Sequence, residues 1–443
     1  MLSRLAAALC ILTILYLFRK DLAKCDGPSN ALWVPLTWMF LAGSRYVSSW
    51  LNLGTPLQSA DAYTEGSSVD AVVFFSLIVA AVGVLSRRNI DWHLVLLRNK
   101  LIWVYFLYCG VSIVWSDIAF VSFKRWIKEL GNPIMALVIL TEDRPYEAVG
   151  VLLRRLAFLL LPLSILFIRY YPDLGRSYWQ GQPMFTGVAH QKNGLGQLCL
   201  VSGIYFSWNF FLNRKERLAF GNRDNIIDIV FLLMLAYLLH MAQSATSTAC
   251  SVVAVGLFYT GRLKAIVHEP TRIIYFGIII VSLFLFLNWL IDVKGFVIGL
   301  LGRDTDLTSR VPIWQMLKGM VTNPLVGTGF MSFWGGHRLE ILWGRVGATI
   351  IQAHNGYLEQ YLNLGFIGVA FIIGIMVTGL LKVRNHLYLD YPSALLRLCF
   401  IVCAALYNYT EASFYGINNM WILLLLGSID VCFHNRQGVA DQN

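Results

Sequence analysis

The sequence predicts an all-α, polytopic membrane protein, and three observations carry that prediction. Of the 443 residues, 57% are hydrophobic and 14% are charged, whereas soluble domains carry about 25% charged residues. So few charges cannot cover a water-facing surface, which excludes a soluble globular enzyme, and the same figures exclude disorder. The apolar residues also form continuous runs that suit membrane helices, whereas β-barrel strands would be short and would alternate with polar residues.

Thirteen apolar runs are candidate membrane spans. The runs 5–18, 126–140 and 246–260 are short, so twelve spans are an alternative. The first run is expected to be an uncleaved span, since no small-residue cleavage site follows it. In order, the runs are 5–18, 31–53, 69–85, 101–115, 126–140, 151–168, 194–212, 226–243, 246–260, 273–291, 357–381, 394–408 and 417–433.

The runs divide the chain into three parts. Residues 1–291 form ten spans with short loops, residues 292–356 form one large loop, and residues 357–443 form the C-terminal spans. Most of the eight cysteines lie inside apolar runs, so their spacing indicates no disulfide framework. The net charge of +10 is expected to come from cytoplasmic loops rather than from nucleic-acid binding.

The distribution of Lys and Arg predicts the orientation. One set of alternate loops carries 21 of the 35 basic residues, and the positive-inside rule assigns this set to the cytoplasm. The large loop 292–356 therefore lies outside. The other 14 basic residues also lie outside, clustered at 124–128, 169–192 and 294–345.

Cations kept on the disfavoured side favour an anionic ligand there, although long loops also cross the membrane regardless of their charge. One cluster lies on an amphipathic segment at 115–130, which suits a helix on the membrane surface. One interpretation of this segment is that it only anchors the protein at the membrane surface. The functional interpretation is that it contacts a lipid-linked phosphate. The candidate ligand-binding residues are Arg45, Arg125, Lys192, Arg303 and Arg310.

Two of these candidates lie where backbone geometry would help them. Lys192 belongs to a Gly-rich stretch, 187–196, that opens a span, and the positive end of a helix attracts anions. Arg303 and Arg310 bracket a polar turn before an expected helix at 312–320, and guanidinium groups match phosphate oxygens bidentately. The alternative is that the two arginines form ordinary salt bridges with Asp304 and Asp306.

The large loop also holds weaker signals. Asp304 and Asp306 match a carboxylate pair that holds a divalent metal in many sugar transferases, but three residues are a weak signal, so no metal and no cofactor are predicted. Gly327 and Gly329 indicate a tight turn. The aromatic residues that follow, up to Trp334, are expected to serve packing rather than to form a platform for a sugar.

His354 opens the span that follows the large loop. On a helix it would share a face with Leu358 and Tyr361. The positive helix end favours the neutral imidazole, which a general base requires. The alternative is an ordinary residue of the membrane interface.

Together these motifs resemble the O-antigen ligase superfamily, nearest its exopolysaccharide-production branch, over residues 31 to 420. The superfamily includes O-antigen ligases, O-antigen polymerases and exopolysaccharide polymerases. The stretches that carry the resemblance are Ser44-Arg45, Ser122–Arg125, His190–Asn193, Gly302–Asp304 with Arg310 and Trp314, Asn323–Phe330, and Ala353–Leu358.

The resemblance implies a membrane glycosyltransferase with a GT-C-like helical fold in the bacterial inner membrane. Its donor would be a polyprenyl-pyrophosphate-linked glycan, and its acceptor another glycan or lipid A-core, at a site facing the periplasm. The family's catalytic histidine maps onto His354, which makes an inverting reaction the expectation, and a family arginine maps onto Arg303 or Arg310. Polysaccharide assembly or export proteins are the further expected partners.

One stretch departs from the family pattern. O-antigen ligases carry an arginine in a short outer turn, whereas the matching stretch here, 243–248, has no cation. Either another basic residue supplies that charge or the donor is held differently. Ligation and polymerisation therefore both stay open, as do the sugar, the linkage and the oligomeric state.

Two functions of other classes compete with the enzyme. One is a transporter or flippase for a lipid-linked glycan or another anionic solute. Transporters usually place ionisable groups near the middle of the membrane, whereas here the polar chemistry gathers at the outer edge. The other is an assembly subunit that binds the glycan without turnover.

Overall fold

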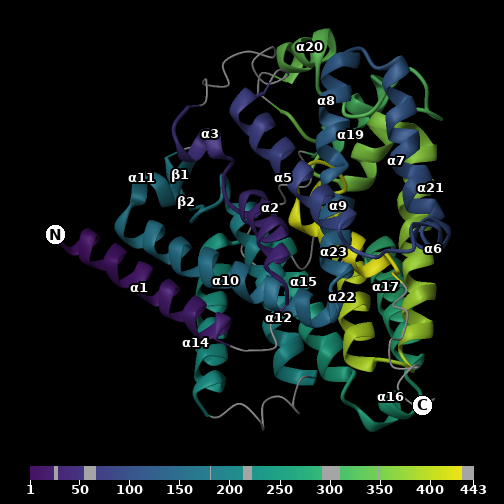
Figure 1. Ribbon diagram of the computed structural model, residues 1–443. Helices are drawn as coiled ribbons and strands as arrows, with labels where there is room; N and C mark the ends of the chain where they lie inside the picture. Colours follow the sequence, from purple (N-terminus) through teal and green to yellow (C-terminus); the bar gives the residue numbers. More distant parts are fainter. Residues whose placement is uncertain are drawn as a thin grey trace.

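The computed structural model describes residues 1–23, 28–53, 66–179, 181–212, 222–291, 310–346 and 350–431. Within these ranges the protein is a bundle of helices with one two-stranded hairpin (Figure 1). Residues 24–27, 54–65, 180, 213–221, 292–309, 347–349 and 432–443 lie outside the description. The prediction of an all-α membrane protein is confirmed.

The first half of the chain forms helices of very different lengths, with two 3₁₀ turns at Asn30–Leu32 and Ser112–Trp115. Its helices are α1 (Leu2–Leu22), α2 (Trp33–Gly43), α3 (Val47–Trp50), α5 (Ser68–Ser86), α6 (Trp92–Arg98), α7 (Lys100–Val111), α8 (Ala119–Glu129), α9 (Gly131–Leu140), α10 (Pro145–Tyr170) and α11 (Pro172–Gly175).

The second half begins with an antiparallel hairpin, β1 (Arg176–Trp179) and β2 (Gln182–Phe185), in which Arg176 is paired with Phe185. The helices that follow are α12 (Lys192–Leu212), α14 (Asn222–Ala242), α15 (Ala245–Thr260), α16 (Lys264–His268), α17 (Arg272–Ile291), α19 (Arg310–Gly319), α20 (Gly336–Val346), α21 (Gly356–His386), α22 (Tyr391–Tyr407) and α23 (Asn419–Ser428).

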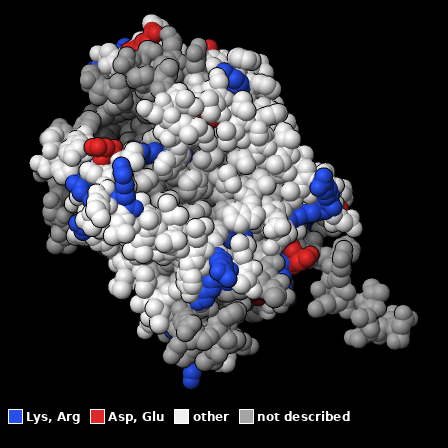
Figure 2. Space-filling model, turned by 60° about the vertical axis from the view of Figure 1, so that its left-hand side comes forward, with Lys and Arg blue, Asp and Glu red and all other residues white. Residues whose placement is uncertain are grey.

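Several helices are long and apolar enough to cross a bilayer. Among the described residues these are α1, α5, α10, α12 and α21, and α6 with α7 forms a sixth span bent by 85°. Four further apolar helices, in α14, α15, α22 and α23, are shorter. Most of the face in Figure 2 carries no charged side chain, as a lipid-facing surface requires. The protein is a multi-pass membrane protein, and the count of twelve or thirteen spans stays a prediction.

Four predicted spans are wrong as single helices. One is 357–381, because the backbone of α21 leaves the helical region at Gly365, where φ is 66°. The run 31–53 stops at Gly43 and resumes as α3, whose first turn is capped by the Asp70 carboxylate, a hydrogen-bond acceptor for the backbone N–H and the hydroxyl of Ser48. The run 101–115 turns 3₁₀ at Ser112, and 126–140 is divided between α8 and α9. Helix α9 has 10 residues, so it is about 15 Å long and covers roughly half of a bilayer.

The core lies where α12 packs against α10, α14 and α15, and where α22 packs against α21 and α23. Every residue of α23 is buried, so this short helix is surrounded by protein. Outside the core, apolar side chains such as Leu9, Phe75 and Ile373 are exposed, as lipid contact allows. Cys399 and Cys403 are part of this core, since both are 0% exposed.

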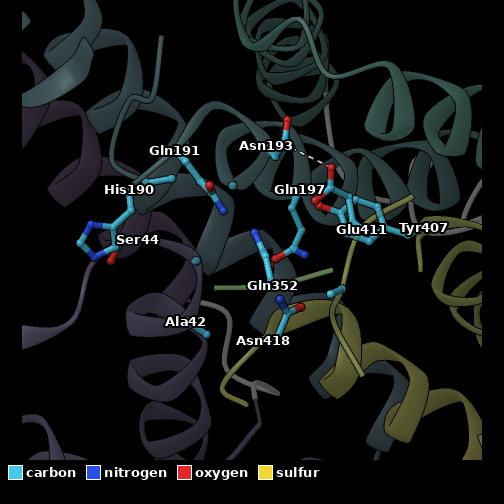
Figure 3. Close-up of a pocket in the computed structure, with 14 residues that line it drawn as sticks. Ala42, Ser44, His190, Gln191, Asn193, Gln197, Gln352, Tyr407, Glu411 and Asn418 are labelled. Carbon is cyan, nitrogen blue, oxygen red and sulfur yellow. Dashed lines mark hydrogen bonds between the residues drawn. The ribbon is translucent and has the colours of Figure 1, made fainter. Parts of the chain in front are cut away.

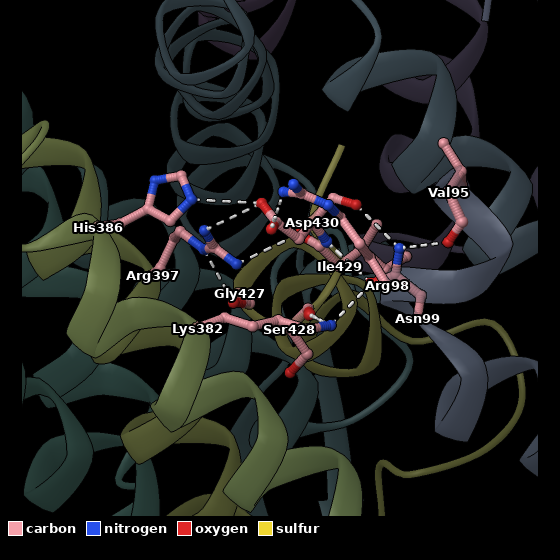
Figure 4. A network of polar contacts seen from close by, with 10 residues as sticks. All are labelled: Val95, Arg98, Asn99, Lys382, His386, Arg397, Gly427, Ser428, Ile429 and Asp430. Atoms are coloured by element: carbon pink, nitrogen blue, oxygen red, sulfur yellow. Dashed lines mark hydrogen bonds and ion pairs between the residues drawn. The ribbon is translucent and has the colours of Figure 1, made fainter. Parts of the chain in front are cut away.

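Two groups of polar residues lie at opposite ends of α21. Residues predicted to lie outside, from the ends of α2, α12, α21, α22 and α23, line one cavity. Residues predicted to lie in the cytoplasm surround Asp430, just past α23 (Figure 4). The carboxylate of Asp430 lies 3.2 Å from Nη1 of Arg98 and 3.3 Å from Nε2 of His386. Loops that the distribution of Lys and Arg assigns to the same side of the membrane therefore lie together in the structure.

Candidate functional site

His354 does not lie on a helix, contrary to the prediction that it shares a helical face with Leu358 and Tyr361. It lies two residues before the start of α21, in the left-handed backbone region at φ 51°. Asn355 is the N-cap of α21, and its side chain accepts a hydrogen bond from the backbone of Leu358. The predicted place of His354 near a helix N-terminus is confirmed.

The backbone on both sides of His354 is held by distant residues. The indole of Trp314 donates to the carbonyl of Ala353 at 2.8 Å. The N–H of Gly356 donates to the carbonyls of Asn408 and Glu411, at 2.8 and 2.9 Å. A Cβ on Gly356 would lie 2.2 Å from Oδ1 of Asn408, so the close approach requires glycine. These contacts fix a backbone conformation that non-glycine residues adopt only where the surroundings enforce it.

The imidazole of His354 faces the carboxylate of Glu411, which lies four positions after the end of α22. Nδ1 of His354 lies 3.4 Å from Oε2 of Glu411. The other carboxylate oxygen, Oε1, accepts a hydrogen bond from the amide of Asn193 at 2.7 Å. With Nδ1–H donating to Glu411, Nε2 of His354 keeps its lone pair. Nε2 lies 3.4 Å from the amide nitrogen of Gln352, and a hydrogen bond donated by that amide requires the tautomer that carries its proton on Nδ1.

A cavity of about 190 Å³ is lined by Glu411 of this pair and by Gln352, whereas His354 itself is not a lining residue. Figure 3 shows amide side chains converging across it from the start of α12, from the segment before His354 and from the start of α23. The lining residues are Ala42, Gly43, Ser44, Ala189, His190, Gln191, Asn193, Gly194, Gln197, Gln352, Tyr407, Glu411, Ala412 and Asn418. The cavity is thus a polar space enclosed by apolar helices.

A second buried carboxylate holds the large loop against α21. Glu359, 0% exposed, accepts hydrogen bonds from the indole of Trp334 at 2.7 Å and from the backbone of Ala353. The predicted tight turn is confirmed, because Gly327 and Gly329 have φ of 68° and 96°. The expected packing role of the aromatic residues is also confirmed, since Trp334 and its neighbours Phe330 and Phe333 are buried. This end of the loop is a rigid support for His354.

Arg45 lies beside the cavity, next to its lining residue Ser44. Its guanidinium donates to the carbonyls of Leu174 and Ala189, the second at 3.4 Å. Burial lowers the pKa of Arg45 from its usual value. Burial and then the positive charge of Arg45 lower the pKa of His190, which favours the neutral imidazole there. Arg45 therefore ties α11 and the turn before α12 to the end of α2.

Two other predicted cations, Arg125 and Lys192, do not line the cavity. Arg125, on α8, donates to the carbonyl of Met331 at 2.7 Å, and Lys192 begins α12 between lining residues without lining the cavity itself. Arg310 is the first residue of α19, which confirms the helix expected at 312–320. Arg303, Asp304 and Asp306 lie outside the described residues.

Glu411 and its neighbours are the functional candidates that the sequence analysis missed. His354 and Glu411 are 57 positions apart in the sequence, and Asn193 and Glu411 are 218 positions apart, so no local pattern contains these contacts. One signal was present: an acidic residue stands alone between the apolar runs 394–408 and 417–433, and isolated ionisable groups between spans mark functional sites.

The turn 243–248, which lacks the family's arginine, borders the same site. The hydroxyls of Thr246 and Thr410 lie 2.5 Å apart, and a Cβ on Gly196 would meet the Ser244 side chain at 2.6 Å. Small side chains thus let the turn approach α12 next to Glu411. In the described part of the chain, no group of three His, Cys, Asp or Glu side chains could hold a metal ion.

Two comparisons with known proteins bear on this site. Residues 229–373 match the family described as O-antigen ligase, and this segment contains His354 but neither Asn193 nor Glu411. The chain is also 27% identical over 294 residues to the exopolysaccharide production protein ExoQ of Rhizobium meliloti (strain 1021). That alignment covers 62% of this chain and 63% of the relative's length. The predicted resemblance to the O-antigen ligase superfamily, nearest its exopolysaccharide-production branch, is confirmed.

Proposed function

We propose that this protein is a membrane glycosyltransferase that transfers or polymerises a polyprenyl-pyrophosphate-linked oligosaccharide in O-antigen or exopolysaccharide synthesis. The observation that carries the proposal is the contact between His354 and Glu411 beside a polar cavity. This arrangement lies in a chain similar to O-antigen ligases and to an exopolysaccharide production protein. A base with an oriented lone pair next to a hydrogen-bonding cavity suits the activation of a hydroxyl group.

In the proposed reaction, Nε2 of His354 takes the proton of an acceptor hydroxyl. The hydroxyl oxygen forms a bond with the anomeric carbon of the donor, and the bond from that carbon to the pyrophosphate oxygen breaks. The electron pair leaves with the polyprenyl pyrophosphate. Glu411 orients the imidazole and stabilises its cationic form. Direct displacement inverts the configuration at the anomeric carbon.

The leaving diphosphate needs fixed positive charges, which act strongly where water is scarce. Arg303 and Arg310 are proposed to bind it, with Lys192, Arg125 and Arg45 as further contacts. The hydrogen bonds that Arg45 and Arg125 make with backbone carbonyls hold these two side chains in place. A guanidinium has five N–H donors, and Arg45 uses Nη2 for both of its carbonyl contacts, so it keeps donors for a phosphate. The reaction is proposed to need no metal ion.

The proposed setting is the bacterial inner membrane, with the cavity facing the periplasm. The excess of Lys and Arg at the opposite end of the helices supports this orientation. A glycan or lipid A-core would be the acceptor, and polysaccharide assembly or export proteins would be further partners. A tag inserted in the segment 292–309 should be reached by a membrane-impermeant reagent in intact spheroplasts, and labelling only after lysis would reverse the orientation.

An assay with purified protein in detergent tests the enzyme against the transporter. The donor is the lipid-linked oligosaccharide extracted from a strain that lacks the protein. We expect elongated or transferred glycan without a second compartment, and turnover that persists in EDTA. Transport of the lipid-linked glycan in proteoliposomes without any product would contradict the proposal. Loss of product in EDTA with rescue by Mg²⁺ or Mn²⁺ would contradict the metal-independent reaction and implicate Asp304 and Asp306.

Gene deletion followed by gel analysis of surface polysaccharides separates the two reactions. Loss of chains linked to lipid A would identify a ligase, whereas accumulation of single repeat units would identify a polymerase. Unchanged polysaccharides, with the deletion verified, would contradict both.

A further inference from the structure

The cavity next to His354 has an unusual set of polar groups. Five of its lining side chains are amides: Gln191, Asn193, Gln197, Gln352 and Asn418. No Lys or Arg lines it within the described part of the chain, and its one carboxylate is Glu411. A phosphate site needs positive charge, whereas this cavity carries the carboxylate of Glu411.

This chemistry selects hydroxyl groups rather than phosphates. An amide offers both N–H donors and a carbonyl acceptor, which matches a hydroxyl group that donates and accepts. A diphosphate only accepts, so it needs donors and positive charge, and the carboxylate of Glu411 would repel it. Gln197 is 8% exposed, so its amide is directed into the cavity rather than into bulk solvent (Figure 3).

The size of the cavity limits what it holds. Pockets for drug-sized ligands measure roughly 300–1,000 Å³, whereas this one measures about 190 Å³. That space suits one sugar ring, and because the cavity is partly open, the rest of a longer glycan would lie outside it. The ring would lie within reach of the contact between Glu411 and His354, where a hydroxyl must lose its proton.

We propose that this cavity is the subsite for the uncharged terminal sugar of the acceptor, read by the amides of Gln191 and Gln197 and closed to acidic sugars by Glu411. The proposal rests on the proposed glycosyltransferase function. It separates the two substrates in space, because the diphosphate of the donor is then bound outside the cavity by the basic residues. It also makes the amides, and not the cations, the residues that determine acceptor specificity.

The test measures binding without turnover, on the full chain in lipid nanodiscs. The probes are methyl glycosides of glucose, galactose, mannose and N-acetylglucosamine, and then methyl β-glucuronide, titrated by saturation-transfer-difference NMR. Inorganic pyrophosphate, which has no carbon-bound protons, is titrated by ³¹P NMR line broadening. The variants are Gln191→Leu and Gln197→Leu, which remove the amide and leave a branched apolar side chain one atom shorter. The matched control is Gln315→Leu, because Gln315 is exposed on α19, away from the cavity lining.

At least one neutral glycoside is expected to bind with a Kd on the order of 1 mM. Each cavity variant should weaken it about threefold to tenfold, as the loss of one hydrogen bond does, and the control should not. Methyl β-glucuronide should bind only after Glu411→Gln. Binding of pyrophosphate that is sensitive to Gln197→Leu would overturn the proposal, as would glycoside binding that neither variant changes, or no glycoside binding at all.

The outcome is distinct from a failure of the proposed function. Glycoside binding that depends on the amides, with no product in the detergent assay, would support the subsite and contradict the glycosyltransferase. Product formation together with glycoside binding that neither amide variant changes would support the glycosyltransferase and contradict the subsite.

Discussion

Two histidine–carboxylate pairs flank helix α21. The distance between histidine and carboxylate is nearly the same in both, but the residues around the two pairs differ. Before its start, His354 lies 3.4 Å from Glu411; at its end, His386 lies 3.3 Å from Asp430. Glu411 is held by a neutral amide and faces a cavity. Asp430 is surrounded by cations, with Nη1 of Arg397 3.9 Å away and the Arg397 side chain 0% exposed.

The difference shows that the surroundings of such a pair decide its role. A base needs a lone pair that a substrate can reach, and the partner of His354, Glu411, lines a polar cavity. The pair at Asp430 instead ties α6, α21 and α22 to the end of α23, and Lys382 completes the network through Asn99 at 2.8 Å (Figure 4). We therefore interpret the first pair as chemical and the second as structural.

The largest effect is expected from His354→Ala. Turnover should fall about 10²–10⁴-fold, the contribution of a positioned base, while the protein still inserts and folds. His386→Ala is the matched control and should leave turnover of the folded protein nearly unchanged. The detergent assay with lipid-linked donor measures both, and equal losses in the two variants would remove the distinction.

Glu411→Gln should lower turnover less, by roughly 10- to 100-fold, because the imidazole stays but loses its orienting charge. The pH profile of kcat should change in the same variant, since Glu411 no longer stabilises the cationic imidazole. A purely structural role would lower the amount of folded protein and leave that profile unchanged. Glu411→Asp should recover part of the activity.

Asp430→Asn should lower stability rather than turnover. Removing one partner of a buried ion pair costs about 3–5 kcal/mol, and the exposure of Arg98, at 46%, places this case near the lower figure. Thermal unfolding in detergent measures the change. A variant with wild-type stability but poor turnover would assign the chemistry to the wrong end of α21.

The stabilising effect of Asp430 should fade in acid. Although burial raises its pKa, the hydrogen bond from His386 and the charges of Arg397 and Arg98 lower it further, to about 2. Because this folded-state pKa lies below the usual 3.8, the contribution is complete above about pH 4 and is lost as the pH falls through 2. The melting difference between wild type and Asp430→Asn should therefore shrink from pH 6 to pH 3, and a constant difference would contradict the assignment.

The smallest effect is expected from Lys192→Ala. Lys192 begins α12 next to the cavity without lining it, so its charge would act on the donor from a distance. KM for the lipid-linked donor should rise about two- to fivefold with kcat unchanged, as for a partly exposed charge. A fall in kcat of the size seen for Glu411→Gln would show that Lys192 acts in the chemical step.

Much of the fold follows from local features of the sequence. The composition requires lipid-facing helices, because 14% charged residues cannot cover a surface in water. Gly327 and Gly329 indicate a turn by their own conformational freedom, and the apolar runs predict most helices by their length. The alternating basic loops separate the residues near His354 from those near Asp430. Each of these depends on a residue and its close neighbours in the chain.

The tertiary structure alone decided the site. The apolar run 31–53 reads as one helix, yet it breaks after Gly43, where Asn419 leaves no room for a side chain. His354 reads as a helical residue, yet contacts from Trp314 and Asn408 hold its backbone outside the helix. The residues next to Glu411 in the sequence do not indicate that it pairs with His354. Pairing across 57 residues is set by how whole helices pack, and local propensity contains no information about that packing.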